Sequence, residues 1–600
     1  MKKLRAHFKK ISEVISYFKR IVKILSSAGK PYLVVIIVLA IIFGVIPGIS
    51  ILVMQEIVNT LQASERSFEY IMRLVAIYVG IDIFSGVMGL ISGYVEGIVQ
   101  MKAGITLNVS VLEKVKELNL KDFENSETYN LIQRAVGTGI NSMFSFFKSF
   151  IHVFQSLINL VVFSLILITL RWWLLPVIFF MPIISTFVTA YFGKKQFLIQ
   201  RNRAGEARKQ WYSQFLLTND IAFKEIKIFN IGDYFRNKYK QLSYKFLAQD
   251  RKILNQRTAA QSGLLLIDQI ISAGLFVFVI ARTFVGEILL GDLITFTRSI
   301  SNVKSSTQGV LGQVNSIYQN VLYISQYFEF IDMKSEVEIA SNESQSLSEI
   351  PFIEINNLSY RYKNKSQYAL QNINIRIEKN NLVAFIGQNG SGKTTLVKIL
   401  STLYNDYQGN VYFGEQNLRD INPETIKKKI GLLFQDYVKY ELSAKENVAL
   451  GQLEKIDDDV AIGRALSKTG MQEKLSDLDM QLGHWFDNGV QLSGGEWLRV
   501  ALSRAFIRDA DLYLLDEPNS ALDSVSERKV LESFKELVSG KIGIIISHRI
   551  ASIKNIADKI VVFDNGTIQA VGTHDELIES SKVYRELYEQ ESGDTYVVKP

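Results

Sequence analysis

Long runs of apolar residues dominate the chain up to about residue 290, whereas the remainder alternates apolar and polar positions as soluble sequences do. A helix needs about 20 mostly apolar residues to cross the hydrocarbon layer of a membrane. Runs near that length predict six membrane-spanning helices, at residues 31–54, 71–100, 143–170, 172–192, 263–284 and 288–327. The alternative is a set of core helices in a large soluble protein. Six runs of similar length, with a consistent charge asymmetry between their connections, favour membrane spans.

Basic residues predict the orientation of these spans. The first 30 residues carry nine Lys and Arg against one Glu, and residues 194–257 carry fifteen against five Asp and Glu. Because basic segments stay in the cytoplasm, both are expected there. Six spans then return the second half of the chain to the same side. No signal peptide is predicted, since no cleavage site follows a short apolar run.

Composition excludes some functions. The chain has no cysteine, which rules out disulfides, cysteine metal ligands and a cysteine nucleophile. The net charge of +7 is modest for 600 residues, so nucleic acid is not predicted as a partner.

The second half predicts an α/β domain. Strand-like alternation occurs at residues 352–355 and 372–378, and buried-strand runs at 382–386, 513–515 and 543–546. With helices between them, these strands predict a largely parallel sheet. The predicted domains are a basic N-terminal segment (1–30), a transmembrane domain (31–333), a Ser- and Glu-rich linker (334–349), the α/β domain (350–590) and a tail (591–600).

A phosphate-binding loop stands between the strand 382–386 and a following helix. Its sequence, Gly-Gln-Asn-Gly-Ser-Gly-Lys-Thr, fits the pattern G-x-x-x-x-G-K-[ST]. The glycines turn backbone N–H groups inward, Lys393 is placed for the β- and γ-phosphates, and Thr394 is placed for Mg²⁺. ATP and Mg²⁺ are therefore the predicted cofactors. The predicted contacts are Gly387, Gln388, Asn389, Gly390, Ser391, Gly392, Lys393, Thr394 and Thr395.

Two further motifs follow the phosphate loop, a glycine pair before a helix at residues 492–496 and an Asp-Glu pair at residues 516–517. Asp516 ends an apolar strand, where its carboxylate can hold the shell of Mg²⁺, and Glu517 beside it can orient or deprotonate an attacking water. Leu-Ser-Gly-Gly-Glu at 492–496 precedes a helix and offers a second anion site, although such a loop more often only caps a helix.

Together, residues 352–588 resemble the nucleotide-binding domain of ATP-binding-cassette (ABC) proteins. The resemblance implies that Ser493, Gly494, Gly495 and Glu496 act on ATP held by a second copy of the domain. Glu496 departs from the Gln usual in the family, and the segment 482–489 is longer and more aromatic than is common.

The same resemblance implies roles for single residues. Tyr362 stacks on adenine, Gln435 lies near Mg²⁺, Asp523 belongs to the D-loop, and His548 is a second catalytic residue that contacts the γ-phosphate. The implied ligands of Mg²⁺ are Thr394, Gln435 and Asp516.

Six spans followed by one cassette resemble an exporter-type half-transporter. The fold expected is a six-helix, all-α transmembrane domain fused to a cytosolic α/β P-loop ATP-binding-cassette domain, working as a homodimer in contact with membrane lipid. Coupling helices are expected at residues 122–130 and 218–230. Charged residues in or near the spans line a cargo path or form structural pairs. They are Asp82, Glu96, Asp268, Arg298 and Lys304.

A closer resemblance, to the nisin- and subtilin-type lantibiotic exporters, lies in residues 433–442, 481–486 and 223–227, with Tyr234 and Phe235. It implies ATP-driven export of a modified precursor peptide across the bacterial plasma membrane, with lantibiotic-modifying enzymes as possible partners. Without a cysteine, the chain is not expected to cleave a leader itself. The alternatives are a multidrug or lipid exporter, a soluble ABC ATPase and an importer subunit.

Overall fold

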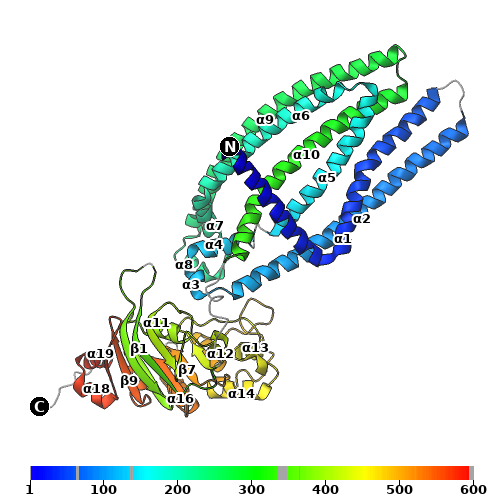
Figure 1. Ribbon diagram of the computed structural model, residues 1–600. Helices are drawn as coiled ribbons and strands as arrows, with labels where there is room; N and C mark the ends of the chain where they lie inside the picture. The colour runs from blue at the N-terminus through cyan, green and yellow to red at the C-terminus, as the bar shows by residue number, and fades with distance from the viewer. Residues whose placement is uncertain are drawn as a thin grey trace. The chain divides into compact units, whose positions relative to one another are not determined.

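The computed structural model describes residues 2–62, 67–135, 137, 140–333, 347–363, 365–519 and 522–592. The chain divides into two compact units. The helical unit comprises Met1–Lys116 and Ser126–Met333, and the cassette unit comprises Glu117–Asn125 and Lys334–Pro600 (Figure 1). Most of the predicted linker and tail lies outside the described residues.

Six long helices build the helical unit. They are α1 (Lys2–Gln62), α2 (Phe68–Lys116), α5 (Ile140–Leu170), α6 (Leu174–Asn202), α9 (Gly232–Phe284) and α10 (Leu290–Ile331). Gly29, at φ 147° and ψ 99°, interrupts α1 close to the predicted start of the first span. The three short connections at residues 62–68, 170–174 and 284–290 define what we call the hairpin end of the unit.

The longer connections contain short helices. Within the helical unit these are α4 (Ser126–Arg134), α7 (Ala204–Thr218), the 3₁₀ turn η2 (Asp220–Ala222) and α8 (Phe223–Ile228). The predicted coupling segment 218–230 thus forms η2 and α8. Three of its apolar side chains are exposed, namely Phe223, Ile228 and Phe229.

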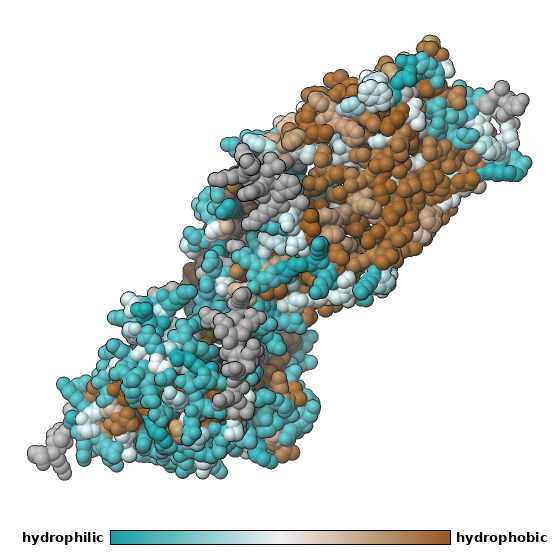
Figure 2. Space-filling model, in the orientation of Figure 1, coloured by the Kyte–Doolittle hydropathy of each residue, from teal (hydrophilic) through white to brown (hydrophobic). Residues whose placement is uncertain are grey.

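Five of the six long helices are apolar enough to cross a membrane by length and composition, and α10 is not among them. The packing of α10 explains why it can be less apolar than the other five long helices. Phe296, Ile300 and Val303 of α10 lie in a core cluster with residues of α1, α5, α6 and α9. The part of α10 that packs on other helices need not present apolar side chains to lipid, whereas Figure 2 shows apolar residues gathered in a broad belt on the outside of this unit.

Side chains of α1 cap the first residues of α10 at the hairpin end. The backbone N–H of Gly291 donates to Oδ1 of Asn59 at 2.8 Å, and Nε2 of Gln55 donates to Oδ1 of Asp292 at 2.6 Å. Asn59 also donates to Asp292, at 3.2 Å. The bond from Gly291 satisfies a backbone N–H that a helix start leaves without an intrahelical partner, and the other two bonds fix Asp292 against α1.

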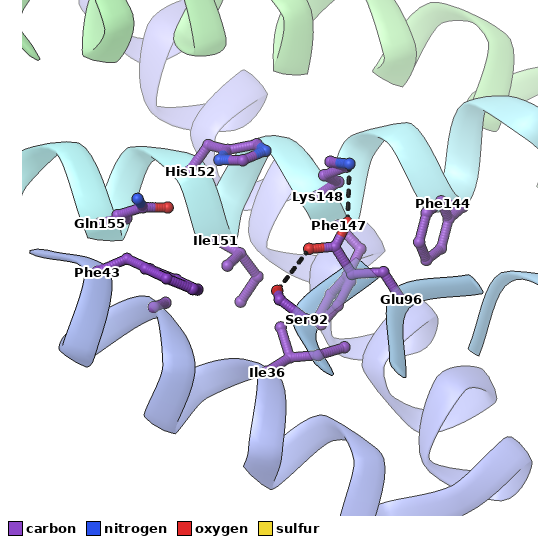
Figure 3. Close-up of a pocket in the computed structure, with 11 residues that line it drawn as sticks. Ile36, Phe43, Ser92, Glu96, Phe144, Phe147, Lys148, Ile151, His152 and Gln155 are labelled. Atoms are coloured by element: carbon purple, nitrogen blue, oxygen red, sulfur yellow. Dashed lines mark hydrogen bonds and ion pairs between the residues drawn. The ribbon is translucent and has the colours of Figure 1, made fainter. Parts of the chain in front are cut away.

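Three of the five charged residues predicted in or near the spans form two ion pairs between helices. In the small pocket of Figure 3, Nζ of Lys148 on α5 lies 2.8 Å from Oε2 of Glu96 on α2, and Ser92 donates to the same carboxylate at 3.1 Å. Nζ of Lys304 on α10 lies 2.7 Å from Oδ1 of Asp268 on α9. Pairing lowers the cost of placing these charges at membrane depth.

Two sheets form the centre of the cassette unit. An antiparallel sheet has the order β2-β1-β4-β5, and a six-stranded sheet has the order β10-β9-β3-β8-β7-β6, in which only the β10–β9 pairing is antiparallel. The strands are β1 (Phe352–Tyr360), β2 (Leu370–Glu378), β3 (Asn381–Gly387), β4 (Gln408–Phe413), β5 (Gln416–Asn417), β6 (Ile430–Leu433), β7 (Leu512–Asp516), β8 (Ile542–Ile546), β9 (Lys559–Asp564) and β10 (Thr567–Gly572). All five predicted strand runs are therefore strands.

The helical segments of this unit pack on the two sheets or, for those at residues 444–468, against the helix at residues 494–506. They are α11 (Lys393–Leu400), α12 (Pro423–Lys428), α13 (Ala444–Ala449), η4 (Leu453–Lys455), α14 (Asp459–Lys468), α15 (Gly494–Phe506), α16 (Ser524–Leu537), α17 (Ile550–Ile553), α18 (His574–Ser580) and α19 (Lys582–Ser592). One apolar core lies between the two sheets, and a second lies beneath α15 and α16. Parallel strands end at a common edge, which gathers the residues that follow β3, β6, β7 and β8.

Candidate functional site

The phosphate loop leads from β3 into α11, as its sequence predicts. Gly387, Gly390 and Gly392 have φ values of 146°, 82° and 104°, a region that favours glycine. A Cβ on Gly387 would lie 2.2 Å from the carbonyl oxygen of Phe563, and one on Gly392 would lie 2.5 Å from that of Ala369. These glycines let the loop curl tightly before the helix, which leaves its N–H groups free to face an anion.

Lys393 folds back over this loop. Its Nζ donates to the carbonyl oxygens of Gly387 and Gln388, at 2.8 and 2.9 Å, and to Oγ of Ser391 at 3.2 Å. Burial lowers the pKa of Lys393 to about 8, although Glu517 nearby acts to raise it. A buried cation held only by neutral acceptors is well suited to a phosphate, which would restore its pKa.

Asp516 ends β7 with a side chain that is almost fully buried. Neither of its carboxylate oxygens has a hydrogen-bond partner among the described residues. Burial is the main reason that the pKa of Asp516 rises to about 6, with Thr394 and Lys393 acting to lower it and Glu517 to raise it. A buried carboxylate with unused oxygens, close to a threonine hydroxyl, fits the oxygen ligands that Mg²⁺ prefers.

The carboxylate of Glu517 joins two other predicted residues. Nε2 of Gln435, after β6, donates to Oε2 of Glu517 at 2.9 Å, and Nε2 of His548, after β8, lies 2.8 Å from Oε1. The three residues come from three neighbouring strand ends of one sheet. A carboxylate held between an amide and an imidazole is fixed in direction, as a group that positions a water molecule must be.

These residues line an open cavity of about 580 Å³ beside the phosphate loop. Tyr362 stands at its wall, with its Oη 3.1 Å from Oγ1 of Thr395 and its ring edge-on to Tyr360. The cavity is also lined by Lys365, Gln367 and Tyr368, which sequence reasoning missed. Their position in the loop 361–369, between β1 and β2, was the available signal, because Tyr362 lies in the same loop.

The segment 493–496 does not line this cavity. Ser493 caps α15, accepting from the N–H of Glu496, while the Glu496 carboxylate accepts from the N–H of Ser493 at 2.8 Å. Glu496 also pairs with Lys474, and this hydrogen bond is the main reason that its pKa falls to about 2. The unusual glutamate thus completes a capping box, leaving Gly494 and Gly495 at the helix start.

Asp523, predicted in the D-loop, caps α16 by accepting from the N–H of Ser526 at 3.4 Å, and it does not line the cavity either. Residues 520 and 521 lie outside the described part of the chain. Within one chain, the structure therefore brings together the phosphate loop, Tyr362, Gln435, Asp516, Glu517 and His548. It leaves residues 493–496 and Asp523 elsewhere.

A buried network that the sequence did not indicate supports the strand ends. Nδ2 of Asn519 donates to Oε1 of Glu527 at 2.7 Å and to Oγ of Ser547 at 3.2 Å. Arg549 closes the network with an ion pair to Glu527 at 2.6 Å. Since Asn519 follows Glu517 by two residues, and Ser547 and Arg549 flank His548, the network fixes the backbone that carries both groups.

The short helix α3 (Leu120–Glu124) overlaps the start of the first predicted coupling segment (122–130) and belongs to the cassette unit, whereas the rest of that segment lies in α4 of the helical unit. Leu120 packs against the core between the two sheets, and Lys121 pairs with Asp406. Oη of Tyr404 donates to Oε1 of Glu124 at 2.8 Å. The Tyr404 ring is edge-on to that of Tyr362, with centroids 5.9 Å apart, so α3 connects to the cavity wall through one aromatic side chain.

Comparison with known proteins agrees with this site. The family model described as ABC transporter matches residues 370–520, and that described as ABC transporter transmembrane region matches residues 33–304. The chain is 35% identical to the subtilin transport ATP-binding protein of Bacillus subtilis, over 92% of this chain and 90% of that protein. It is 33% identical to the nisin transport ATP-binding protein of Lactococcus lactis subsp. lactis, over 95% of each.

Among solved structures, an ATP-bound bacterial exporter of the Atm1 family matches with a TM-score of 0.78, covering 95% of this chain and 99% of that one. At 19% identity, that likeness shows the fold alone. The relatives, the two family models and the assembled phosphate site lead to one conclusion: this chain is a multi-pass membrane protein with a transport ATPase domain, and it belongs to the ABC transporter family.

Proposed function

We propose that this protein exports a lantibiotic-like precursor peptide across the bacterial plasma membrane, driven by ATP hydrolysis. The observation that carries the ATPase part is the Glu517 carboxylate held between Gln435 and His548 beside the phosphate loop. The cargo rests on the relatives, because the subtilin and nisin transport proteins align with more than 90% of this chain.

In this proposal the phosphate loop and Lys393 bind the phosphates of ATP, and Tyr362 stacks on the adenine. Thr394, Gln435 and Asp516 hold Mg²⁺, which would neutralise charge on the phosphate oxygens when bound. Glu517 accepts a proton from the attacking water, and His548 contacts the γ-phosphate and keeps the carboxylate aligned.

The working form is a homodimer. Ser493, Gly494, Gly495 and Asp523 do not line the cavity of their own chain, which is expected if they complete the ATP site of a second copy. The glycine-rich start of α15 then supplies N–H groups to a phosphate. Glu496 fixes this helix start through its capping box, so its contribution to the second copy is indirect.

The basic segments 1–30 and 194–257 support a cytoplasmic location for the N-terminus, the long connections and the cassette. Membrane lipid surrounds the apolar belt of the helical unit. Enzymes that modify the precursor peptide are candidate partners on the cytoplasmic side.

A cavity in the helical unit, lined by apolar side chains together with a set of polar ones, is a candidate site for a peptide cargo. It has a volume of about 760 Å³ and lies between α6 and α10. Its polar lining is mainly amide and phenol groups, and Lys194 is its single charged residue. Amides donate and accept hydrogen bonds at once, which matches the backbone of a peptide. These residues are Gln196, Gln200, Asn315, Gln319, Tyr318 and Tyr323.

The first prediction tests the proposal with Glu517→Gln. Loss of the general base should lower ATP hydrolysis by about 10²-fold or more, while ATP still binds. The purified protein should therefore retain nucleotide, and vesicles carrying it should not move a leader-bearing lantibiotic precursor peptide.

Glu532→Gln is the matched control, because among the described residues Glu532 forms only an exposed pair with Arg528. It should hydrolyse ATP and export peptide like the wild type. Equal peptide export by Glu517→Gln and wild type would refute the role of Glu517. Wild-type ATPase activity that responds to lipids or apolar drugs, and not to the peptide, would refute the cargo.

A further inference from the structure

Charged side chains in the apolar stretches of the six long helices are almost all paired within the chain. Glu96 pairs with Lys148, and Asp268 pairs with Lys304. Near the hairpin end, Arg73 pairs with Glu69, Arg282 pairs with Glu287, and Asp292 accepts from Gln55 and Asn59. This pairing is what an apolar surrounding demands.

Two residues remain. Asp82 on α2 and Arg298 on α10 are both exposed, and neither has a side-chain partner among the described residues. Each lies inside a stretch predicted to cross the membrane, where an ionised side chain needs a partner, a water-filled cavity or another charge. Asp82 carries a negative charge and Arg298 a positive charge, so each can neutralise the other.

We propose that these residues meet across the dimer, with Asp82 of one protomer forming an ion pair with Arg298 of the partner subunit. The inference rests on the homodimer of the proposed function. In a two-fold symmetric dimer the same contact occurs twice, because the second protomer's acid faces the first protomer's base. One dimer therefore neutralises all four charges that single chains leave unmatched.

The positions along the helices agree with such a contact. Asp82 lies fourteen residues from Phe68 at the start of α2, and Arg298 lies eight residues from Leu290 at the start of α10. Both helices start at the hairpin end, so the two residues lie about 21 and about 12 Å from it along their axes. A long arginine side chain and ordinary helix tilt cover a difference of this size.

A surface for the partner adjoins Asp82. The same helix exposes several large apolar side chains near Asp82, on a face about 100° around the helix from it. They are Ile83, Phe84, Val87, Leu90 and Tyr94. Arg298 forks into several donors, which suits a carboxylate reached across such an interface.

Cross-linking tests the contact directly, because the wild-type chain contains no cysteine and needs no background changes. Two differently tagged chains, one with Asp82→Cys and the other with Arg298→Cys, would be co-expressed and purified in nanodiscs. A short bismaleimide should give a product that carries both tags, in the nucleotide-free protein or in ATP-trapped protein that also carries Glu517→Gln. The matched control is Leu112→Cys in place of Asp82→Cys, on the same exposed helix but about 45 Å further along, and it should give no mixed-tag product.

Charge reversal gives an independent readout. Asp82→Arg and Arg298→Asp should each lower peptide-stimulated ATPase activity by about tenfold, because each places like charges together. The double variant Asp82→Arg/Arg298→Asp should recover to within about threefold of wild type, since it restores the pair in reverse.

The outcomes are distinct. A mixed-tag product with recovery in the double variant supports the pair. The absence of that product in both nucleotide states, or a double variant no more active than the singles, overturns it and leaves these charges to cargo or lipid. If the mixed-tag product forms but wild-type vesicles move no peptide, the pair stands and the proposed cargo falls.

Discussion

Glu517 holds a backbone conformation that a glutamate seldom adopts, with φ at 51°. Its N–H still donates to the carbonyl oxygen of Ile546 at 3.0 Å, so the strain lies at the point where the chain leaves the sheet. This turn of the backbone aims the carboxylate at Gln435 and His548. Strain of this kind persists where the surrounding structure fixes it, and here the Asn519–Glu527 network does so.

The second prediction concerns Asp516, whose pKa of about 6 exceeds the ordinary value of 3.8. The ionised carboxylate therefore reduces the free energy of unfolding above about pH 6, and this cost disappears as pH falls toward 3.8. Without Mg²⁺ or nucleotide, Asp516→Asn should stabilise the cassette at pH 7.5 by on the order of 1–3 kcal/mol.

Thermal unfolding of the nucleotide-free protein between pH 4.5 and 7.5 measures this effect. The advantage of Asp516→Asn over wild type should shrink as the pH is lowered through 6. Added Mg-ATP should stabilise the wild type and have little effect on the variant. An advantage that stays constant with pH would contradict a raised pKa for Asp516.

The sequence was sufficient to predict some residues of this site and not others. Local patterns were enough to expect the phosphate loop beside Asp516 and Glu517, because each directly follows an apolar strand. Asn519, Glu527 and Arg549 escaped notice, since their bonds join positions up to thirty residues apart and none has a distinctive motif. The engagement of Glu496 in a capping box was readable in principle, from a serine followed three residues later by a glutamate.

At the scale of elements, the contact between α1 and α10 is tight enough to test by adding one methyl group. This third prediction uses Gly291→Ala, whose Cβ would lie 2.4 Å from both Oδ1 of Asn59 and the carbonyl oxygen of Gln55. The helices must separate to admit it, so the variant should lose about 1–3 kcal/mol of stability.

Gly312→Ala is its control, on the same helix but with nothing within 4 Å of the added Cβ. Alanine is the better helix former, so this variant should be neutral or up to about 1 kcal/mol more stable. Unfolding midpoints of both variants in detergent give the comparison. Similar midpoints for the two would mean that α1 and α10 are not closely packed at the hairpin end.

The fourth prediction concerns the connection between α3 and the cassette. Tyr404→Phe removes the hydrogen bond to Glu124 and keeps the ring that faces Tyr362. The loss should cost about 1 kcal/mol. If α3 transmits cargo binding to the ATP site, peptide stimulation of ATP hydrolysis should fall several-fold while the basal rate changes little.

Tyr407→Phe provides a close match, because the buried Tyr407 hydroxyl has no hydrogen-bond partner among the described residues. Removing that hydroxyl should leave both stability and peptide stimulation near wild type. If peptide stimulates ATP hydrolysis equally in Tyr404→Phe and wild type, the bond between Tyr404 and α3 plays no part in the response to cargo.

The element scale also shows where hydropathy alone fails. Six spans were predicted from run length, yet five of the described helices are long and apolar enough to cross a membrane, and α10 is not among them because it carries three charged residues, Asp292, Arg298 and Lys304, and many Ser, Thr, Asn and Gln residues. Its place among other helices, with an ion pair from Lys304 to Asp268, makes those residues tolerable. That information lies in the packing and not in the composition of the segment.

For the whole molecule, the order of motifs was sufficient to predict the class of fold, and the match to an exporter at 19% identity shows how little sequence that fold requires. The proposed contact between two chains, by contrast, could not be predicted from the order of motifs. Asp82 and Arg298 stand out only once the partners of the other charges in the apolar stretches of the helices are known, and finding those partners needs coordinates.

Because Glu117–Asn125 belong to the cassette unit, they determine where a fragment containing the cassette must begin. A fragment that starts after the linker would lack nine residues that fold with it, including Leu120. Its surface would expose the apolar residues that Leu120 covers and would leave the Tyr404 hydroxyl without Glu124, and the exposed apolar surface would favour aggregation. A soluble fragment would need those residues restored, through a short graft or a peptide added in trans.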